Sequence, residues 1–218
     1  ASRVEPTAVL VAAAAAASRP PAAFLQGSAV GWYGDRGDEE LNEEAAAGSG
    51  FLAELARQWE AASAPLDALG VRRVVLRTGV VLAREGGAFA RLVPPFRWGL
   101  GGPLGSGRQY FPWIHLADQV GAMRLVLARG ELAGVVNLVA PQALRQRDFA
   151  GALGRALGRP ALLPAPTPLL RLALGEMADV LLAGQRVVPA RLLAAGYPFR
   201  FADLESALAD LLAADGKR

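Results

Sequence analysis

Residues that commonly perform chemistry are scarce in this chain. It contains no cysteine and a single histidine, His115, so the sequence excludes a thiolate nucleophile, cysteine-bound zinc and a histidine metal cluster, and predicts no metal site. The chain has three tyrosines, Tyr33, Tyr110 and Tyr197, and its only lysine is Lys217 in the terminal Gly-Lys-Arg tail. That lysine is too remote to assist any of the tyrosines.

A glycine-rich segment at residues 101–107 is the one candidate phosphate-binding loop. In a dinucleotide-binding fold such a loop joins the first strand to a helix. This segment instead lies between an apolar helix and an extended stretch, which favours a flexible lid or turn. Arg97 and Arg108 flank it and could meet a phosphate, although exposed arginines are common in proteins generally.

Composition is typical of a globular protein. Of the 218 residues, 53% are hydrophobic and 20% charged, and the formal net charge is +3. The arginines are scattered without interleaved aromatic residues, so nucleic-acid binding is not expected. The longest apolar run, residues 8–17, is shorter than the roughly 20 residues of a membrane-spanning helix. We expect a soluble protein of the cytoplasm or of an organellar matrix or stroma, because a chain without disulfides suits a reducing compartment.

Apolar periodicity predicts alternating strands and helices in residues 1–140. The stretch 71–82 is almost continuously apolar and rich in β-branched residues, which is typical of a strand buried on both faces of a parallel sheet. Further strands are predicted at 24–28 and 135–139, an extended segment at 109–114, and helices at 4–18, 50–69, 87–96 and 116–129. This alternation predicts an α/β fold with a parallel sheet.

The character of the chain changes at residue 141. Helices are predicted at 145–157, 167–183, 189–195 and 202–213, separated by turns that contain proline or glycine. We therefore divide the chain into an α/β domain, residues 1–140, and a small, mostly helical domain, residues 141–218. The second domain is expected to cap the C-terminal edge of the sheet and to shape a substrate cleft.

Several short motifs occur in a specific order along residues 2–213. They are 27–35 (GSAVGWYGD), 59–60 (WE), 76–82 (LRTGVVL), 100–107 (LGGPLGSG), 111–115 (FPWIH), 175–177 (GEM), 185–187 (QRV) and 196–199 (GYPF). Together they resemble the atypical extended short-chain dehydrogenase/reductases of the nucleoside-diphosphate-sugar epimerase-like group, which includes bacterial epimerase family proteins and a plastid relative associated with chloroplast division. The resemblance implies a Rossmann-like domain that binds NADP or NAD.

Members of that group begin with a strand, a Gly-x-x-Gly-x-x-Gly turn and a helix, which hold the dinucleotide pyrophosphate. No such unit precedes the first predicted helix here. A Rossmann-like sheet without its first strands would expose a long edge. We therefore expect the sheet to be incomplete at its N-terminus and the native polypeptide to extend upstream of Ala1.

The standard catalytic pair of the group is absent. Short-chain dehydrogenases use Tyr-x-x-x-Lys, in which the lysine lowers the pKa of the tyrosine. Four residues after the three tyrosines stand Gly37, Ile114 and Phe201. If Glu60 is aligned with the glutamate that often follows the pair, residues 52 and 56 (Leu and Ala) occupy the two catalytic places.

The resemblance implies a remaining catalytic pair, Ser28 and Tyr33. The usual spacing, Ser-x-x-x-Tyr-Gly, is one residue shorter than the one found here, so Ala29 is an alternative equivalent of the serine. Ser28 could be a turn residue only, and Tyr33 could simply pack.

Further site residues are implied by the same resemblance. Arg77, Thr78 and Gly79 resemble the strand end beside the nicotinamide and are predicted to bind the cofactor, unless Thr78-Gly79 is simply where that strand bends. Arg108, His115 and Asp118 are predicted to bind substrate. Structural alternatives are a hydrogen-bonded histidine for His115, a helix-terminal charge for Asp118 and a common exposed arginine for Arg108.

Two hypotheses of function follow. The first is an NAD(P)-binding reductase or epimerase-like enzyme that acts on a small or nucleotide-linked substrate through a non-standard proton donor. The second is a non-catalytic assembly, structural or regulatory subunit with a protein partner. The missing pair favours the second, and the retained strand-end motifs favour the first. The acidic stretch 35–44 is expected to be a solvated loop.

Overall fold

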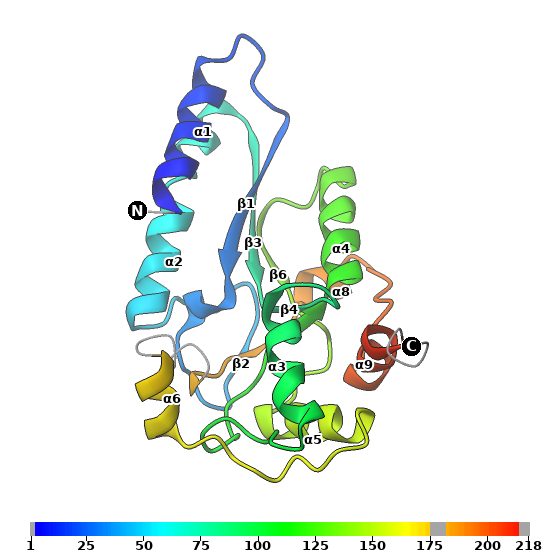
Figure 1. Ribbon diagram of the computed structural model, residues 1–218. Helices are drawn as coiled ribbons and strands as arrows, with labels where there is room; N and C mark the ends of the chain where they lie inside the picture. The colour runs from blue at the N-terminus through cyan, green and yellow to red at the C-terminus, as the bar shows by residue number, and fades with distance from the viewer. Residues whose placement is uncertain (1–2, 175–181, 214–218) are drawn as a thin grey trace.

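A three-stranded parallel sheet forms the centre of the molecule in the computed structural model, which describes residues 3–174 and 182–213 (Figure 1). Its strands are β1 (Ala23–Ala29), β3 (Arg72–Thr78) and β6 (Gly134–Leu138), in the order β1-β3-β6. Helices α1 (Val4–Ala16) and α2 (Phe51–Ala61) lie beside β1, and α4 (Leu116–Ala128) lies beside β6. The predicted α/β fold with a parallel sheet is confirmed.

The apolar stretch 71–82 forms two strands, so the prediction of one continuous strand was wrong. After β3 the chain bends at Gly79 and continues as β4 (Val80–Leu82), which pairs in parallel with β5 (Trp113–His115). The backbone N–H of Gly79 still donates to Leu138 of β6, at 3.1 Å, whereas that of Val80 donates to Pro112, at 2.7 Å. A Cβ at position 79 would lie 2.7 Å from the Pro112 oxygen, so glycine permits the close approach at which the chain changes partner.

The remaining predicted helices are present with altered ends. The segment predicted as a helix over 50–69 divides into α2 and a 3-10 helix, η2 (Ala64–Leu69), because a proline stands at the start of η2. Helix α3 (Gly87–Arg97) follows β4, and the short 3-10 helix η1 (Val30–Tyr33) follows β1. No helix in the described ranges is long and apolar enough to cross a membrane.

The C-terminal part is mostly helical, as predicted. It contains α5 (Gln146–Ala156), α6 (Thr167–Leu174), α8 (Ala190–Ala194) and α9 (Leu204–Leu212). The segment predicted as a helix over 167–183 is described as a helix only to residue 174, and residues 175–181, with the 175–177 motif, lie outside the described residues. A short strand, β7 (Arg186–Val187), pairs with β2 (Glu40–Leu41), so the C-terminal part shares a two-stranded ladder with the first part of the chain.

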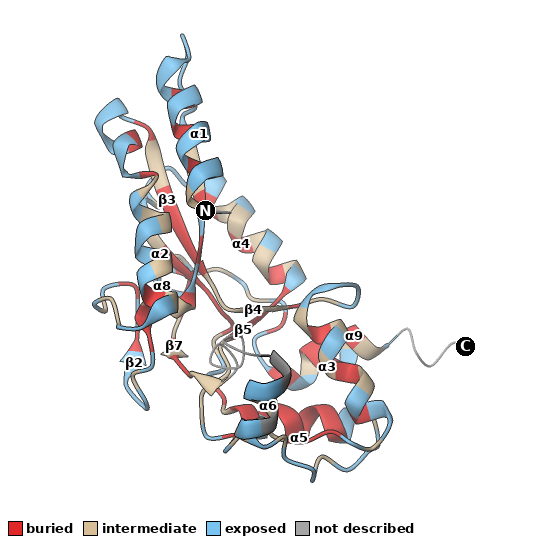
Figure 2. Ribbon diagram, turned by 60° about the vertical axis from the view of Figure 1, so that its left-hand side comes forward, coloured by how far each residue is buried: buried red, intermediate tan, exposed pale blue. Residues whose placement is uncertain are grey.

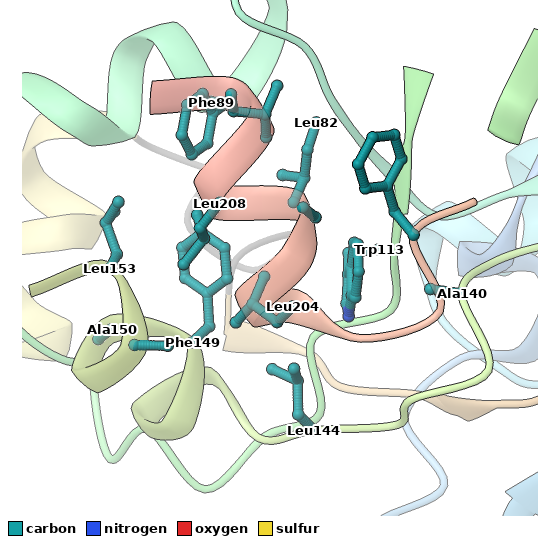
Figure 3. Close-up of a cluster of buried hydrophobic side chains, with 14 of the residues drawn as sticks. Leu82, Phe89, Trp113, Ala140, Leu144, Phe149, Ala150, Leu153, Leu204 and Leu208 are labelled. Atoms are coloured by element: carbon teal, nitrogen blue, oxygen red, sulfur yellow. The ribbon is translucent and has the colours of Figure 1, made fainter. Parts of the chain in front are cut away.

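The largest hydrophobic cluster joins the two halves of the chain. Leu82, Phe89 and Trp113 of the first half pack with Phe149 and Leu153 of α5 and with Leu204 and Leu208 of α9 (Figure 3). Figure 2 shows buried residues concentrated on the strands and on the inner faces of α3, α5 and α9, while α1 is mostly exposed. A division between residues 140 and 141 stays a prediction, and this shared core crosses it.

The glycine-rich segment is tied to the C-terminal part of the chain. Backbone hydrogen bonds join Gly101 to Leu163, Pro103 and Gly105 to Ala165, and Gly107 to residue 147 at the start of α5. A Cβ at Gly102 would lie 2.2 Å from the Leu163 oxygen. The segment is a tightly packed connector that contains a turn, in which the N–H of Gly107 donates to the Leu104 oxygen at 3.0 Å. The expected turn is therefore present, and the backbone pairings on both sides hold it in place of a free lid.

Candidate functional site

A row of polar residues crosses the central sheet near the carboxyl ends of its strands. The parallel register places Ser28 of β1 opposite Arg77 of β3, and Arg77 opposite Asn137 of β6. All three residues are buried. Parallel strands surrounded by helices normally carry apolar residues at such positions. A polar row at this edge of the sheet is therefore the candidate functional site, since open α/β sheets bind ligands outside the carboxyl ends of their strands.

Glu60, from the last turn of α2, binds two members of the row. Its Oε1 accepts hydrogen bonds from the Ser28 hydroxyl, at 2.6 Å, and from Nε of Arg77, at 2.9 Å. Its Oε2 accepts a third, from Nη2 of Arg77, at 2.9 Å. The two side chains of this bidentate ion pair are only 4% and 12% exposed. The pair therefore fixes α2 against two neighbouring strands with charge-assisted hydrogen bonds.

Arg77 is also covered by aromatic rings of η1. Its guanidinium carbon lies 3.3 Å from the ring centre of Trp32 and 5.0 Å from that of Tyr33, as in cation–π contacts. Burial alone would lower the pKa of Arg77, but its hydrogen bonds and charge interaction with Glu60 raise that pKa above its ordinary value. One nitrogen, Nη1, is buried and has no hydrogen-bond partner among the described residues. A buried donor of this kind is a place for an acceptor atom of a ligand.

Tyr33 and Asn137 connect the row to the acidic stretch after η1. The fully buried hydroxyl of Tyr33 donates to Oδ1 of Asn137 at 2.7 Å. The backbone N–H groups of Asn137 and Arg191 donate to Oε1 of Glu43, at 3.0 and 3.3 Å. Burial raises the pKa of Tyr33, so the hydroxyl is protonated at neutral pH and acts as a hydrogen-bond donor. Glu43 is buried, so the expectation of a solvated loop was wrong at this residue.

Thr78 and Gly79, the other predicted cofactor-binding residues, end β3 beside this row. The Thr78 hydroxyl makes long contacts, 3.4 Å to the Leu76 oxygen and 3.5 Å to the Gln119 amide. It therefore has hydrogen-bonding capacity left for a ligand. Gly79 has the packing role described above, which confirms that this strand bends there. Their contact with a cofactor stays a prediction.

His115 and Asp118 lie together at the start of α4, not in the polar row. Nδ1 of His115 accepts from the backbone N–H of Ala117 at 3.1 Å, so the neutral ring carries its proton on Nε2, which lies 3.4 Å from Asp210 of α9. The ring packs on Phe201 at 4.0 Å between centroids. Burial, as the main cause, lowers the pKa of His115. The histidine thus caps α4 and contacts α9.

Both carboxylate oxygens of Asp118 are occupied by the chain itself. They accept from the backbone N–H groups of Arg200, at 2.8 Å, and Phe201, at 2.9 Å. The Tyr197 hydroxyl lies 3.2 Å from Oδ1, and burial followed by the charge of Asp118 raises the pKa of Tyr197 to about 12. Asp118 therefore holds the segment 197–201 onto α4. Substrate binding by His115 and Asp118 stays a prediction, and both already have structural contacts.

Arg108 lies in a third place. It is exposed and lines an open pocket of about 410 Å³ together with residues of the 35–38 turn and the start of α5.

The structure thus brings Ser28, Tyr33 and Arg77 together, with Thr78 and Gly79 adjacent in the chain. Sequence reasoning missed Glu43 and Asn137 as members of the site and missed the role of Glu60. A buried-strand pattern interrupted by Arg77 and Asn137 was the available signal. Lys217 lies outside the described residues.

Parallel strands, flanking helices and a polar row at the strand ends define a Rossmann-like protein of the nucleotide-binding type. Comparison with known proteins agrees with this class. Residues 165–211 match a family model described as a domain of unknown function, DUF1731. Mouse epimerase family protein SDR39U1 is 44% identical over 97% of this chain and 73% of its own length. An epimerase family protein of Mycobacterium bovis is 45% identical over 95% of this chain and 68% of its own.

A solved structure supports the same assignment. The crystal structure of human epimerase family protein SDR39U1 (isoform 2) with NADPH has a TM-score of 0.92 and 41% identity, over 97% of this chain and 72% of that one. The chain therefore belongs to the SDR39U1-like epimerase family of short-chain dehydrogenase/reductase-type proteins. The family resemblance and the Rossmann-like fold predicted from the sequence are confirmed.

Proposed function

We propose that this protein binds NADP(H) at the carboxyl ends of β1 and β3 and uses it for hydride chemistry on a small or nucleotide-linked substrate. The observation that carries the proposal is the buried Ser28–Arg77–Asn137 row, which stands where α/β sheets bind nucleotides. The human relative with a TM-score of 0.92 was crystallised with NADPH, which favours NADP(H) over NAD(H). A cytoplasmic or organellar-matrix location is part of the same proposal.

The groups present at the strand ends fit a nucleotide cofactor. The Thr78 hydroxyl has only long contacts, and Nη1 of Arg77 is a buried donor without a described partner. Both can meet acceptor oxygens, and Ser28 retains lone pairs while donating to Glu60. When bound, the cofactor supplies or accepts a hydride. Arg77 and Glu60 neutralise one another, so they position Ser28 without adding net charge at this edge.

Proton transfer would need a donor other than the standard relay. Tyr33 is the tyrosine of the site, and the cation beside it is Arg77, not a lysine. Because burial raises the pKa of Tyr33, its hydroxyl can orient a substrate oxygen by donating a hydrogen bond but is a weak acid. The Ser28 hydroxyl likewise serves as a hydrogen-bond donor, to Glu60. The proposed enzyme is therefore a reductase or epimerase-like protein with a non-standard proton donor.

A non-catalytic subunit is the second candidate function. The observation that favours it is that both candidate acids donate to internal acceptors, Ser28 to Glu60 and Tyr33 to Asn137. In this alternative the fold binds a nucleotide, or none, and serves a protein partner as an assembly or regulatory component.

Calorimetric titration of the full chain with NADPH and NADH tests the proposal. We expect NADPH to bind, and Thr78→Val, which removes one hydroxyl without changing the shape, to weaken it by roughly 2- to 12-fold, the value of one hydrogen bond. The matched control is Thr7→Val on α1, whose hydroxyl bonds to Arg3 and Trp59 and which should leave affinity unchanged. Absence of heat with either cofactor on folded wild type would end the NADP(H) proposal.

A further inference from the structure

A pocket of about 410 Å³ opens beside the turn that follows η1. Its walls include two carboxylates, Asp35 and Asp38, two arginines, Arg108 and Arg145, and the ring of Tyr110. The wall formed by residues 35–38 begins two residues after the tyrosine of the strand-end site, so the pocket is next to that site along the chain. Its volume lies within the range of small-molecule sites, and most of its wall is polar.

Arg145 is fixed in this pocket by groups that carry no charge. It directly precedes α5, and its Nη1 donates to the backbone oxygen of Arg108. Its guanidinium carbon lies 4.7 Å from the ring centre of Tyr110. The side chain is 26% exposed. These contacts present the cation to the pocket in one orientation, whether or not a carboxylate is bound to it.

The carboxylate that pairs with Arg145 is that of Asp38, which lies in an exposed turn. Oδ1 of Asp38 lies 2.9 Å from Nη2 of Arg145, and the Asp38 side chain is 72% exposed. Ion pairs of such exposed groups contribute little free energy. The guanidinium of Arg108 makes no ion pair within the described part of the chain. The pocket is therefore lined by two guanidinium groups and two carboxylates, of which only Asp38 and Arg145 are paired, and that pair is weakly held.

We propose that this pocket binds the anionic group, phosphate or carboxylate, of a hydroxylated small molecule, and that Asp38 is an internal anion which the ligand displaces from Arg145. The inference rests on the proposed function only in identifying the ligand as the substrate. Arg145 offers a bidentate fork, Arg108 adds the second positive charge, and Ser106 supplies a hydroxyl for the ligand. Asp38 makes the site selective, because an uncharged ligand gains nothing by replacing it.

Calorimetric titration of the full chain with glucose 1-phosphate, glucuronate and glucose tests this proposal. We expect glucose 1-phosphate or glucuronate to bind and glucose not to bind, and the stronger of the two anions identifies the group recognised. Asp38→Asn should tighten that anion by about 1.5- to 5-fold, the value of one exposed ion pair. Arg145→Gln should weaken it at least about tenfold, as for a lost charge-assisted hydrogen bond.

Arg147→Gln is the matched control. Arg147 lies two residues away, is 57% exposed, lies 3.8 Å from Asp148 and is outside this pocket, so its replacement should leave affinity unchanged. An equal loss in both glutamine variants would show general charge attraction and overturn the site. Asp38→Asn with unchanged or weaker affinity would overturn the displacement. Failure of wild type and Asp38→Asn to bind either anion would overturn the whole proposal.

Titration of the same proteins with NADPH separates this inference from the proposed function. If NADPH affinity is unchanged in Arg145→Gln while anion binding is lost, the pocket is a substrate site distinct from the cofactor site. If wild type binds the sugar anion but not NADPH, the proposed function fails and the pocket stands. If Arg145→Gln weakens NADPH as much as the anion, the pocket belongs to the cofactor and the inference is overturned.

Discussion

Replacement of Glu60 by alanine should destabilise the fold far more than a typical surface substitution. The change removes the acceptor of three hydrogen bonds, one from Ser28 and two from Arg77. It leaves the Arg77 charge in a place where its side chain is 4% exposed and where Nη1 already lacks a described partner. Breaking a buried ion pair by removing one partner costs about 3–5 kcal/mol. For a chain of this size that corresponds to a fall in Tm of about 6–20 °C.

Urea denaturation followed by circular dichroism measures this loss. Glu54→Ala is the matched control, because Glu54 lies on the same helix and pairs with Arg57 in an exposed position, where loss of the pair should change stability little. If Glu60→Ala fails to fold, the milder Glu60→Gln should still fold, and its urea midpoint should be lower than that of wild type. A double variant, Glu60→Gln with Arg77→Met, should cost less than the sum of its parts. A loss of stability in Glu60→Ala no larger than that in Glu54→Ala would refute the role given to the Glu60–Arg77 pair.

Three further outcomes are expected. Tyr33→Phe should lower any turnover by much less than several powers of ten, because no lysine lowers the pKa of this tyrosine, and a loss of that size in kcat at unchanged affinity would identify it as an essential acid. The pKa of His115 is lowered in the folded protein, so as pH falls the unfolded chain binds the proton first. Wild type should therefore lose stability from about pH 6.5 down to the folded pKa. A plot of urea midpoint against pH should be steeper there for wild type than for His115→Asn, and equal slopes would contradict this. Gly79→Ala should lose about 1–3 kcal/mol by overpacking against Pro112, whereas Gly130→Ala, with nothing within 4 Å of the added Cβ, should not, and equal denaturation midpoints for the two would reject the packing role of Gly79.

The amino-acid sequence by itself determined the class of the fold and which catalytic side chains these 218 residues contain. Most predicted elements lie close to their observed ranges, namely strands β1 and β6 and helices α1, α3, α4 and α5. The reason is that an element with one buried face has apolar residues at a regular spacing in its own sequence. Within these 218 residues, the lack of cysteine and the position of the lone lysine leave no thiolate and no Tyr-x-x-x-Lys spacing. The motifs, in their order, were sufficient for the family.

Only the tertiary structure decided which polar residues form a site. Glu60 meets Arg77 and Ser28 across 17 and 32 residues, and Tyr33 meets Asn137 across 104. Local periodicity carries no information on such pairs, because they depend on the register between strands and on where a helix crosses the sheet. For the same reason Glu43 lies in an acidic stretch yet is buried under Asn137. The break at Gly79 likewise depends on Pro112, 33 positions further along the chain, and becomes visible only when both strands are in place.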